Sequence, residues 1–408
     1  MSLKDIAHEK LSAIRERGTY RELRELSGPH GTRVQLNGRD VLLFAGSNYL
    51  DLSHLERVVE AAVRGARDWG CAAGGSRLIS GNLDLHEGFE AEIAAFTGCE
   101  SALLFNTGYA ANLGIIPALV GPDDFVVSDS LNHASIIDGV RLSRAQSRVF
   151  PHADCAALDK ALSEVSRDGV RVLVPLDGIF SMDGDIAPLK TMVEIAHRHG
   201  AMVMLDDAHG TGTLGEGGRG SGAHCDVMDE IDIHMGNLAK GIGSFGAYVA
   251  GPRELRDLLI NVARSFIFTC ALPPPQVAAA RESLKLVGEE PWRRWQLQCN
   301  AAQLRKRLAA AGLSTEPSQT HIVPVILGDN ARTMAVCEAM LERGFYVQGI
   351  RHPSVPRGSA RLRITPMATH TAEEIDALAD ALVEVVAEHP DPDSSTLTTQ
   401  VEDTDGGT

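Results

Sequence analysis

The most constraining feature of the sequence is a long alternation of short apolar runs with amphipathic helical segments, from about residue 47 to residue 286. Apolar runs between such helices are typical of strands that are buried on both faces of a sheet. In one example, a helix is predicted to begin near Pro188 and to end at Gly200, and the strand 201–205 follows it. The alternation predicts an α/β fold with helices on both faces of the sheet.

A chain of 408 residues exceeds the size at which one hydrophobic core stops growing, so we expect a large domain and a smaller one. The sequence divides into an N-terminal helix and arm (1–46), a large domain (47–286), a small α+β C-terminal domain (287–389) and a tail (390–408). Thr371 and Glu374 form a capping box at the start of the last helix. The tail is polar and acidic, and we expect it to be disordered.

Charge and cysteine usage argue against several classes of function. The formal net charge of −16 disfavours a general nucleic-acid or anionic-membrane surface, because such partners are bound by basic side chains. The seven cysteines are scattered, with no CxxC pair and no cluster with histidine, so we expect reduced thiols and no metal site. The sequence shows no signal-peptide core and no run long enough to span a membrane, and we expect a cytoplasmic protein.

Two polar residues near strand ends are the main candidates for chemistry. Asp206 ends the apolar run MVMLD, and Lys240 follows among glycines between two further apolar runs. A carboxylate at a strand end could keep the ring nitrogen of a cofactor protonated, and a buried lysine could form a Schiff base. Taken singly, Asp206 is more often a helix or loop cap, and most lysines are solvated. The pair together favours a cofactor site.

The turn 105–109 joins the strand SALLF to an apolar helix. Free N–H groups at the start of that helix, at Gly108 and Tyr109, would suit a phosphate. A plain strand-to-helix turn has the same pattern, so both interpretations stay open.

Four other polar residues are each ambiguous alone. His133 could stack on a flat ring and His209 could bond a phenolic oxygen, but structural histidines are the commoner case. Ser181 has the same ambiguity. Arg363 could bind a substrate carboxylate or be an exposed strand arginine.

Nine segments, in this order, resemble the α-oxoamine synthase family: SNYLDL, GGSRLISGN, FNTGYAANLG, LNHASIIDG, DGIFSMDGDIAPL, LDDAHGTGTLGEGGRG, NLAKGIGSFGAYVAG, FIFTCALPPP and RLRIT. The likeness extends from about residue 3 to residue 387. Members of this family are fold type I transferases that depend on pyridoxal 5'-phosphate (PLP) and condense an amino acid with an acyl thioester. The resemblance implies a mainly parallel seven-stranded sheet, PLP as the cofactor and a homodimer with shared active sites.

The resemblance also implies roles for individual residues. Lys240 would be the Schiff-base lysine and catalytic base, Asp206 the partner of the pyridine nitrogen, and His133 and His209 further catalytic residues. Cofactor contacts are implied for Gly108, Tyr109, His133, Ser181, Asp206, His209, Asn237, Lys240, Thr269 and Cys270, with Thr269 and Cys270 reaching the phosphate in the neighbouring subunit. Substrate contacts are implied for Asn48, Ser354 and Arg363.

Within the family, four segments most resemble the branch of 8-amino-7-oxononanoate synthases, which join alanine to a pimeloyl thioester in biotin synthesis. These segments are LNHASIIDGVRLS, FSMDGDIAPL, HIVPVILGD and IRHPSVPRGSARLRIT. Three sites depart from the family pattern: Asn237 replaces Thr, Thr269-Cys270 replaces Ser-Thr, and 351–354 reads Arg-His-Pro-Ser in place of Arg-Pro-Pro-Thr. They leave open an enzyme of specialised or sphingoid-base metabolism that uses another amino acid or acyl chain. A non-catalytic partner subunit is the alternative from a different class, and the acyl donor could be CoA or an acyl carrier protein.

Overall fold

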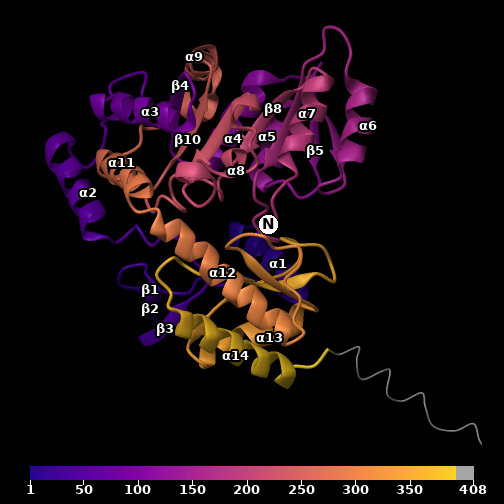
Figure 1. Ribbon diagram of the computed structural model, residues 1–408. Coiled ribbons are helices and arrows are strands. Elements are labelled where there is room, and N and C mark those ends of the chain that lie inside the picture. Colours follow the sequence, from indigo (N-terminus) through magenta and orange to yellow (C-terminus); the bar gives the residue numbers. More distant parts are fainter. Residues whose placement is uncertain (392–408) are drawn as a thin grey trace, which may run out of the picture.

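The computed structural model describes residues 1–391, so the tail predicted over 390–408 lies almost entirely outside the described residues. A seven-stranded sheet forms the centre of the larger of two regions, with strand order β4-β10-β9-β8-β7-β5-β6 (Figure 1). Its strands are β4 (Ser101–Phe105), β5 (Phe125–Asp129), β6 (Gln146–Phe150), β7 (Val172–Asp177), β8 (Met202–Asp206), β9 (Ile233–Asn237) and β10 (Ala247–Gly251). β10 runs antiparallel to both its neighbours and the other pairs are parallel. The predicted mainly parallel sheet is confirmed.

Helices cover both faces of this sheet. One face packs against α4 (Gly108–Leu119), α5 (Ala134–Ser143), α9 (Arg253–Val262) and α10 (Arg264–Ile267). The other packs against α2 (Glu56–Trp69), α3 (Asp84–Thr97), α6 (Cys155–Val165), α7 (Leu189–Arg198) and α11 (Pro274–Glu289). In β8, Met204 contributes to the first side, and Val203 and Leu205 contribute to the second. This alternation explains the continuous apolar run, because successive side chains enter different cores.

The smaller region combines the N-terminal arm with the C-terminal part of the chain. After α1 (Leu3–Glu16), a four-stranded sheet contains β1 (Leu26–Ser27), β2 (Arg33–Leu36), β3 (Arg39–Leu43) and β12 (Phe345–Tyr346). A three-stranded antiparallel sheet contains β11 (Val323–Gly328), β14 (Ala360–Ile364) and β13 (Gln348–Ile350). It packs with α12 (Trp292–Ala310), α13 (Asn330–Glu342) and α14 (Ala372–Glu388) around a core of its own. The predicted capping box of Thr371 and Glu374 begins α14.

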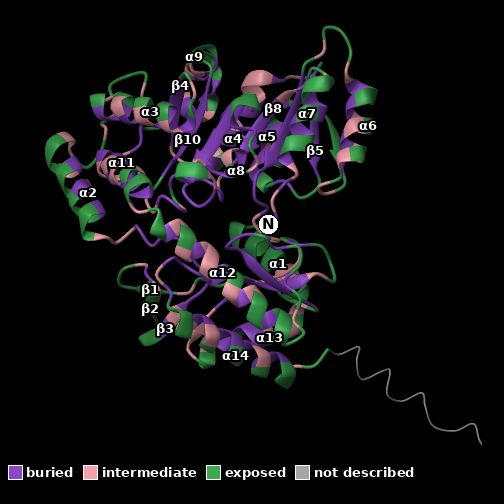
Figure 2. Cartoon of the chain, in the orientation of Figure 1, coloured by how far each residue is buried: buried purple, intermediate pink, exposed green. Residues whose placement is uncertain are grey.

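The predicted domain boundaries remain proposals. Figure 2 shows buried residues along the central strands and exposed residues on the outer sides of the helices. The two regions have separate hydrophobic clusters, which supports a division near the junction of α11 and α12. Because α11 continues to Glu289, a boundary at residue 286 would cut its last turn. We therefore propose that the division lies just after this helix.

The loops that follow the parallel strands face the smaller region. The carbonyl oxygen of Gly184, after β7, accepts the backbone N–H groups of Gln319 and Thr320 at 3.0 and 3.1 Å. Between β8 and β9 the chain forms the short helical turns η1 (Glu216–Gly218), α8 (Ser221–His224) and η2 (Met228–Glu230). The carboxyl ends of the central strands therefore face the smaller region. Ligands of α/β proteins usually bind at these strand ends.

Across residues 1–391, every helix is too short or too polar to cross a membrane. The cytoplasmic location expected from the sequence stays a prediction.

Candidate active site

The ends of β7 and β8 bring two carboxylates to the edge of one pocket. Asp177 and Asp206 are the last residues of these strands, and they are paired in register. The pocket is lined by Gly108, Tyr109, His133, Ser135, Asp177, Ser181, Asp206, Ala208, His209, Met235, Asn237 and Lys240. Eight of the residues implied by the resemblance therefore meet in one place, although they come from distant parts of the chain.

Asp206 is almost fully buried, with 3% of its surface exposed. Its carboxylate accepts hydrogen bonds from the side-chain amide of Asn112 at 2.7 Å and from the backbone N–H of Ala208 at 3.1 Å. Asn112 also donates to the hydroxyl of Ser135 at 2.8 Å, and thereby fixes the carboxylate against α4 and α5. Asn112 did not stand out in the sequence, but a single amide inside an apolar helix is a usable signal for such a role.

Asp177 is a second buried carboxyl group that the sequence analysis did not identify. It accepts the backbone N–H of His133 at 2.6 Å. Burial, and then the nearby charge of Asp206, raises the pKa of Asp177 well above its ordinary value. The available signal was the run VLVPLD, which ends in aspartate as MVMLD does.

Lys240 lies in the turn after β9, and its Nζ atom is 2.8 Å from Nε2 of His209. Burial lowers the pKa of Lys240 from the usual 10.5, although Tyr49 and Asp206 oppose this effect. Burial, followed by the charges of Lys240 and Arg363, lowers the pKa of His209 well below its ordinary value. His209 is therefore neutral, and the lysine amine loses its proton more readily than an exposed one.

A buried tyrosine, Tyr49, contacts the other ring nitrogen of His209, on the side away from Lys240. The hydroxyl of Tyr49 is 2.8 Å from Nδ1 of His209, and Tyr49 is fully buried. Arg363 donates through Nη2 to the same hydroxyl at 3.3 Å. The resulting chain of Tyr49, His209 and Lys240 was not foreseen, because Tyr49 is 160 residues from His209 in the sequence.

His133 combines a pocket position with a structural role. It is the N-cap residue of α5, and its Nδ1 accepts the backbone N–H of Ser135 at 3.3 Å. The same nitrogen is 2.7 Å from the hydroxyl of Ser135. These contacts fix the plane of the ring at the side of the pocket.

The start of α4 also lines the pocket, through Gly108 and Tyr109. The Thr107 side chain caps the helix by accepting the N–H of Ala110 at 3.0 Å, and Gly108 is the first helical residue. A Cβ atom on Gly108 would lie 3.2 Å from Nδ2 of Asn237, so the glycine allows β9 and the helix start to approach closely. Tyr109 is exposed, and its hydroxyl bonds to Asp138. A helix N-terminus in this position suits a phosphate.

The remaining predicted residues lie outside the pocket. Thr269 accepts a bond from the side chain of Asn106 at 3.0 Å, and both border a separate cavity with Cys270. Ser354 lies on an exposed loop, where its hydroxyl accepts a bond from Arg21. In this single chain, these three predicted contacts do not reach the pocket.

Asn48 and Arg363 are both buried, but they differ in what they could bind. The side-chain amide of Asn48 donates to the carbonyl of His30 and to Asp51, and its oxygen accepts the N–H of Leu52. Asn48 therefore has no free polar group for the predicted contact with substrate. Arg363 is 8% exposed, and the alternative of an exposed strand arginine is therefore wrong. Its Nε donates to the carbonyl of Ser181, at the border of the pocket.

The donor set of the pocket fits PLP. Asp206 accepts bonds from two neutral groups and keeps capacity to accept another from a ring nitrogen. Lys240 offers an amine of lowered pKa for an aldehyde, and the start of α4 offers backbone N–H groups for a phosphate. In residues 1–391, no cluster of three or more histidine, cysteine, aspartate or glutamate side chains is arranged to hold a metal ion.

Comparisons with known proteins agree with this geometry. The family model for aminotransferase class I and II matches residues 39–382. The 8-amino-7-oxononanoate synthase of Citrifermentans bemidjiense is 50% identical over 379 residues, which cover 92% of this chain and 97% of that protein. The serine palmitoyltransferase structure from Sphingomonas wittichii is similar with a TM-score of 0.88 and 32% identity, covering 94% of this chain and 97% of that one. An 8-amino-7-oxononanoate synthase structure from Francisella tularensis has a TM-score of 0.74 and 28% identity, covering 85% of this chain and 98% of that one.

Both of these named activities belong to the α-oxoamine synthases, and a further serine palmitoyltransferase neighbour was solved with PLP. The extent of the match, nearly the full length of each relative, includes every segment that builds the pocket. The chain therefore belongs to the class I and II aminotransferase family, and within it to the α-oxoamine synthases, which are PLP-dependent enzymes.

Proposed function

We propose that this chain is an 8-amino-7-oxononanoate synthase that condenses L-alanine with a pimeloyl thioester and releases carbon dioxide. The observation that carries the proposal is the shared pocket of Lys240 and Asp206, where an amine of lowered pKa lies with a buried carboxylate. The names of relatives at 46–50% identity favour this branch of the family.

The pocket residues divide the binding of PLP among them. Asp206 would accept the N–H of the pyridine ring, and His133 would lie against the ring face. Backbone N–H groups of Gly108 and Tyr109 would bind the phosphate, with Asn237 close by. When bound, PLP supplies an electron sink for negative charge on the Cα atom of the amino acid.

Lys240 is the proposed base that removes the Cα proton. Its amine, once protonated, is only a hydrogen-bond donor, so Nε2 of His209 must then accept and Nδ1 must carry the imidazole proton toward Tyr49. When the amine is neutral, the opposite tautomer is available. The neutral imidazole of His209 can therefore bond to both protonation states of Lys240 without taking a charge of its own.

Arg363 is the proposed site for the carboxylate of the amino acid. Its guanidinium is buried beside Ser181 and Tyr49, and within residues 1–391 no carboxylate forms an ion pair with it. A buried guanidinium without a counter-charge is costly. A substrate carboxylate would supply that charge at the border of the pocket, close to the amine of Lys240.

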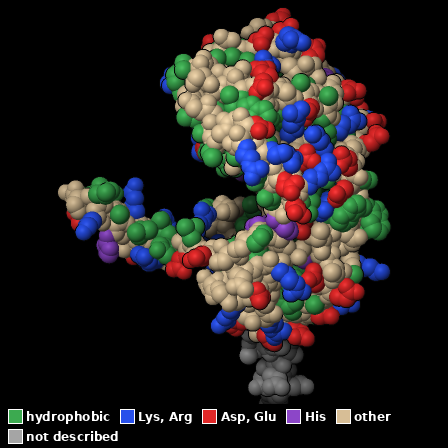
Figure 3. All heavy atoms as spheres, turned by 90° about the vertical axis from the view of Figure 1, so that its left-hand side faces the viewer, with side chains coloured by type: hydrophobic (Ala, Val, Ile, Leu, Met, Phe, Trp, Pro, Cys, Tyr) green, Lys and Arg blue, Asp and Glu red, His purple; other side chains and the backbone are tan. Residues whose placement is uncertain are grey.

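The N-terminal arm supports the proposed homodimer. None of the residues of α1 is buried, and its apolar side chains Leu3, Ile6 and Leu11 are 83%, 38% and 38% exposed. Figure 3 shows this arm standing away from the body of the molecule. Contact with a second copy would cover this apolar surface, and a composite active site would bring Thr269 and Cys270 toward the neighbouring phosphate.

A matrix of amino acids against acyl thioesters tests the proposed substrates. The holoenzyme is incubated with alanine, serine or glycine and with pimeloyl or longer acyl groups, each on CoA and on an acyl carrier protein. Product mass and carbon dioxide release are measured, and alanine with a pimeloyl thioester is expected to give the highest kcat/KM. A preference for serine with a long acyl chain would instead favour an enzyme of sphingoid-base synthesis. This is the second candidate function, because the structure is similar to that of a serine palmitoyltransferase.

A further inference from the structure

His152 lies between two buried carboxylates at the edge of the sheet, outside the residues that line the pocket. Its Nδ1 is 3.1 Å from Oδ1 of Asp129, and its Nε2 is 2.9 Å from Oδ2 of Asp185. The side chains of Asp129 and Asp185 are 0% and 7% exposed, and that of His152 is 24% exposed. A neutral imidazole carries only one N–H, so donation to both carboxylates requires the imidazolium.

The surroundings of His152 favour this charged form. Burial opposes it, but the hydrogen bonds to Asp129 and Asp185 raise the pKa of His152 to about 10. The ring of Phe180 meets His152 edge-on, with the ring centroids 4.3 Å apart. The carboxylate of Asp129 also accepts the backbone N–H groups of Leu131 and Ala153, each at 2.8 Å.

The three residues connect loops that follow three neighbouring strands. Asp129 ends β5 and begins the turn that leads to His133, whereas His152 follows the end of β6. Asp185 belongs to the loop after β7, and its carbonyl oxygen accepts the N–H of Phe180 at 3.1 Å, next to Ser181. His133 and Ser181 both line the pocket. The side chain of His152 thus joins the two loops that border the pocket on this side.

We propose that His152 is a positioning residue that, as an imidazolium, holds the loops of His133 and Ser181 at a fixed separation through its two carboxylate partners. His152 is not among the residues that line the pocket. The inference relies on the proposed function only in that these two loops border the cofactor pocket.

The first test is made on the protein without PLP, so that it does not depend on activity. Histidine selectively labelled with ¹⁵N is observed by NMR, and a His152→Gln sample assigns the signal. We expect both ring nitrogens of His152 to be protonated at pH 8, where a free histidine is neutral. A spectrum in which His152 is a neutral tautomer at pH 8 overturns the proposal.

The second test measures the dissociation constant of PLP by absorbance titration. His152→Gln is expected to weaken binding on the order of tenfold, which equals the lower end of the loss of metal affinity that follows removal of an outer-shell partner of a metal ligand. His199→Gln is the matched control, because His199 has a similar side-chain exposure of 19% and bonds to Asp159, and neither residue lines the pocket. Equal constants for the two variants contradict the proposal.

A double variant distinguishes positioning from a general loss of structure. In His152→Gln, Asp129 and Asp185 face each other without the intervening positive charge. Adding Asp185→Asn removes one of these charges, and we expect PLP binding to recover by at least about threefold relative to His152→Gln. A double variant that binds PLP no better than His152→Gln contradicts the proposal. Substrate selectivity enters none of these three tests, so the proposed reaction could fail while this inference stands.

Discussion

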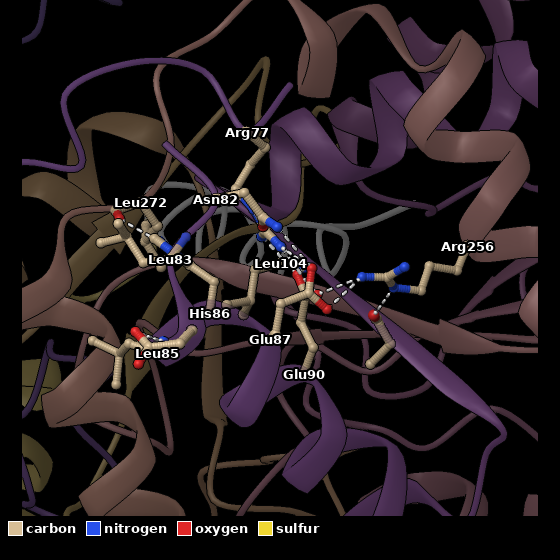
Figure 4. Close-up of polar contacts among 12 residues, drawn as sticks. Arg77, Asn82, Leu83, Leu85, His86, Glu87, Glu90, Leu104, Arg256 and Leu272 are labelled. Atoms are coloured by element: carbon tan, nitrogen blue, oxygen red, sulfur yellow. Dashed lines mark hydrogen bonds and ion pairs between the residues drawn. The ribbon is translucent and has the colours of Figure 1, made fainter. Parts of the chain in front are cut away.

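The buried ion network of Glu90 gives a prediction whose size can be worked from the structure. Glu90, on α3, is 3% exposed and accepts two hydrogen bonds from Arg77 at 2.7 and 3.1 Å (Figure 4). Its carboxylate also accepts Nη2 of Arg256 at 3.1 Å and the backbone N–H of Leu104 at 2.9 Å. Each carboxylate oxygen therefore faces two donors. In Glu90→Gln, either orientation of the new amide places its NH₂ group against two N–H donors.

Removing one partner of a buried ion pair costs about 3–5 kcal/mol. The unfolding entropy is about 2.1 cal/mol/K per residue, so for a chain of this length that loss lowers Tm by about 4–6 °C. Glu92, on the same helix, provides the matched control. It pairs with Arg281 while both side chains are 35% exposed, and such pairs contribute only about 0.2–1 kcal/mol. Glu92→Gln should lower Tm by about 1 °C or less.

Differential scanning calorimetry of both variants, without PLP and at one scan rate, measures this difference. Glu90→Gln is expected to unfold several degrees below Glu92→Gln. Equal shifts for the two variants would refute the reasoning, because burial would then have no influence on the cost of losing the charge.

Three further predictions concern the pocket. In Asp206→Asn, kcat should fall at least about 100-fold, because a neutral amide at this buried position does not stabilise positive charge on the ring nitrogen. An unchanged kcat in steady-state assays would contradict the role of the carboxylate. Tyr49→Phe leaves Nδ1 of His209 without its buried partner and should cost about 1–3 kcal/mol in unfolding free energy, with a lower kcat and an altered pH profile of kcat. An unchanged pH profile would contradict a role of Tyr49 in orienting His209. Because burial lowers the pKa of Lys240, the rate at which PLP combines with the apoprotein should rise as the pH is raised, with a midpoint below pH 10.5. A midpoint at or above pH 10.5 would show that the amine is exposed.

Much of the fold could be predicted because burial on both faces of a sheet leaves a plain pattern in the sequence. Apolar runs such as the one that ends at Asp206 indicate strands, and the carboxyl ends of parallel strands meet at one edge. The reversed direction of β10 could not be predicted in this way, because an antiparallel strand buried on both faces has the same apolar run.

The candidate site was predictable where chemistry restricts the residue type, as for Lys240 and Asp206. Asn112, Tyr49 and Asp177 were not found, because each acts through a partner that is distant in the chain. Asn48 matched a family segment, but in the structure its amide bonds to neighbouring loop residues. Hydrogen-bond saturation of this kind depends on the folded backbone and leaves no mark in the sequence.

The central claim is that the amine of Lys240 and the carboxylate of Asp206 belong to one PLP site. Its most direct test is to reduce the PLP-bound protein with borohydride, digest it and locate the pyridoxyl group by peptide mass spectrometry. The account predicts one labelled peptide with the group on Lys240, and no label in Lys240→Ala. A pyridoxyl group on another lysine, or a PLP-bound protein that borohydride leaves unlabelled, would contradict it.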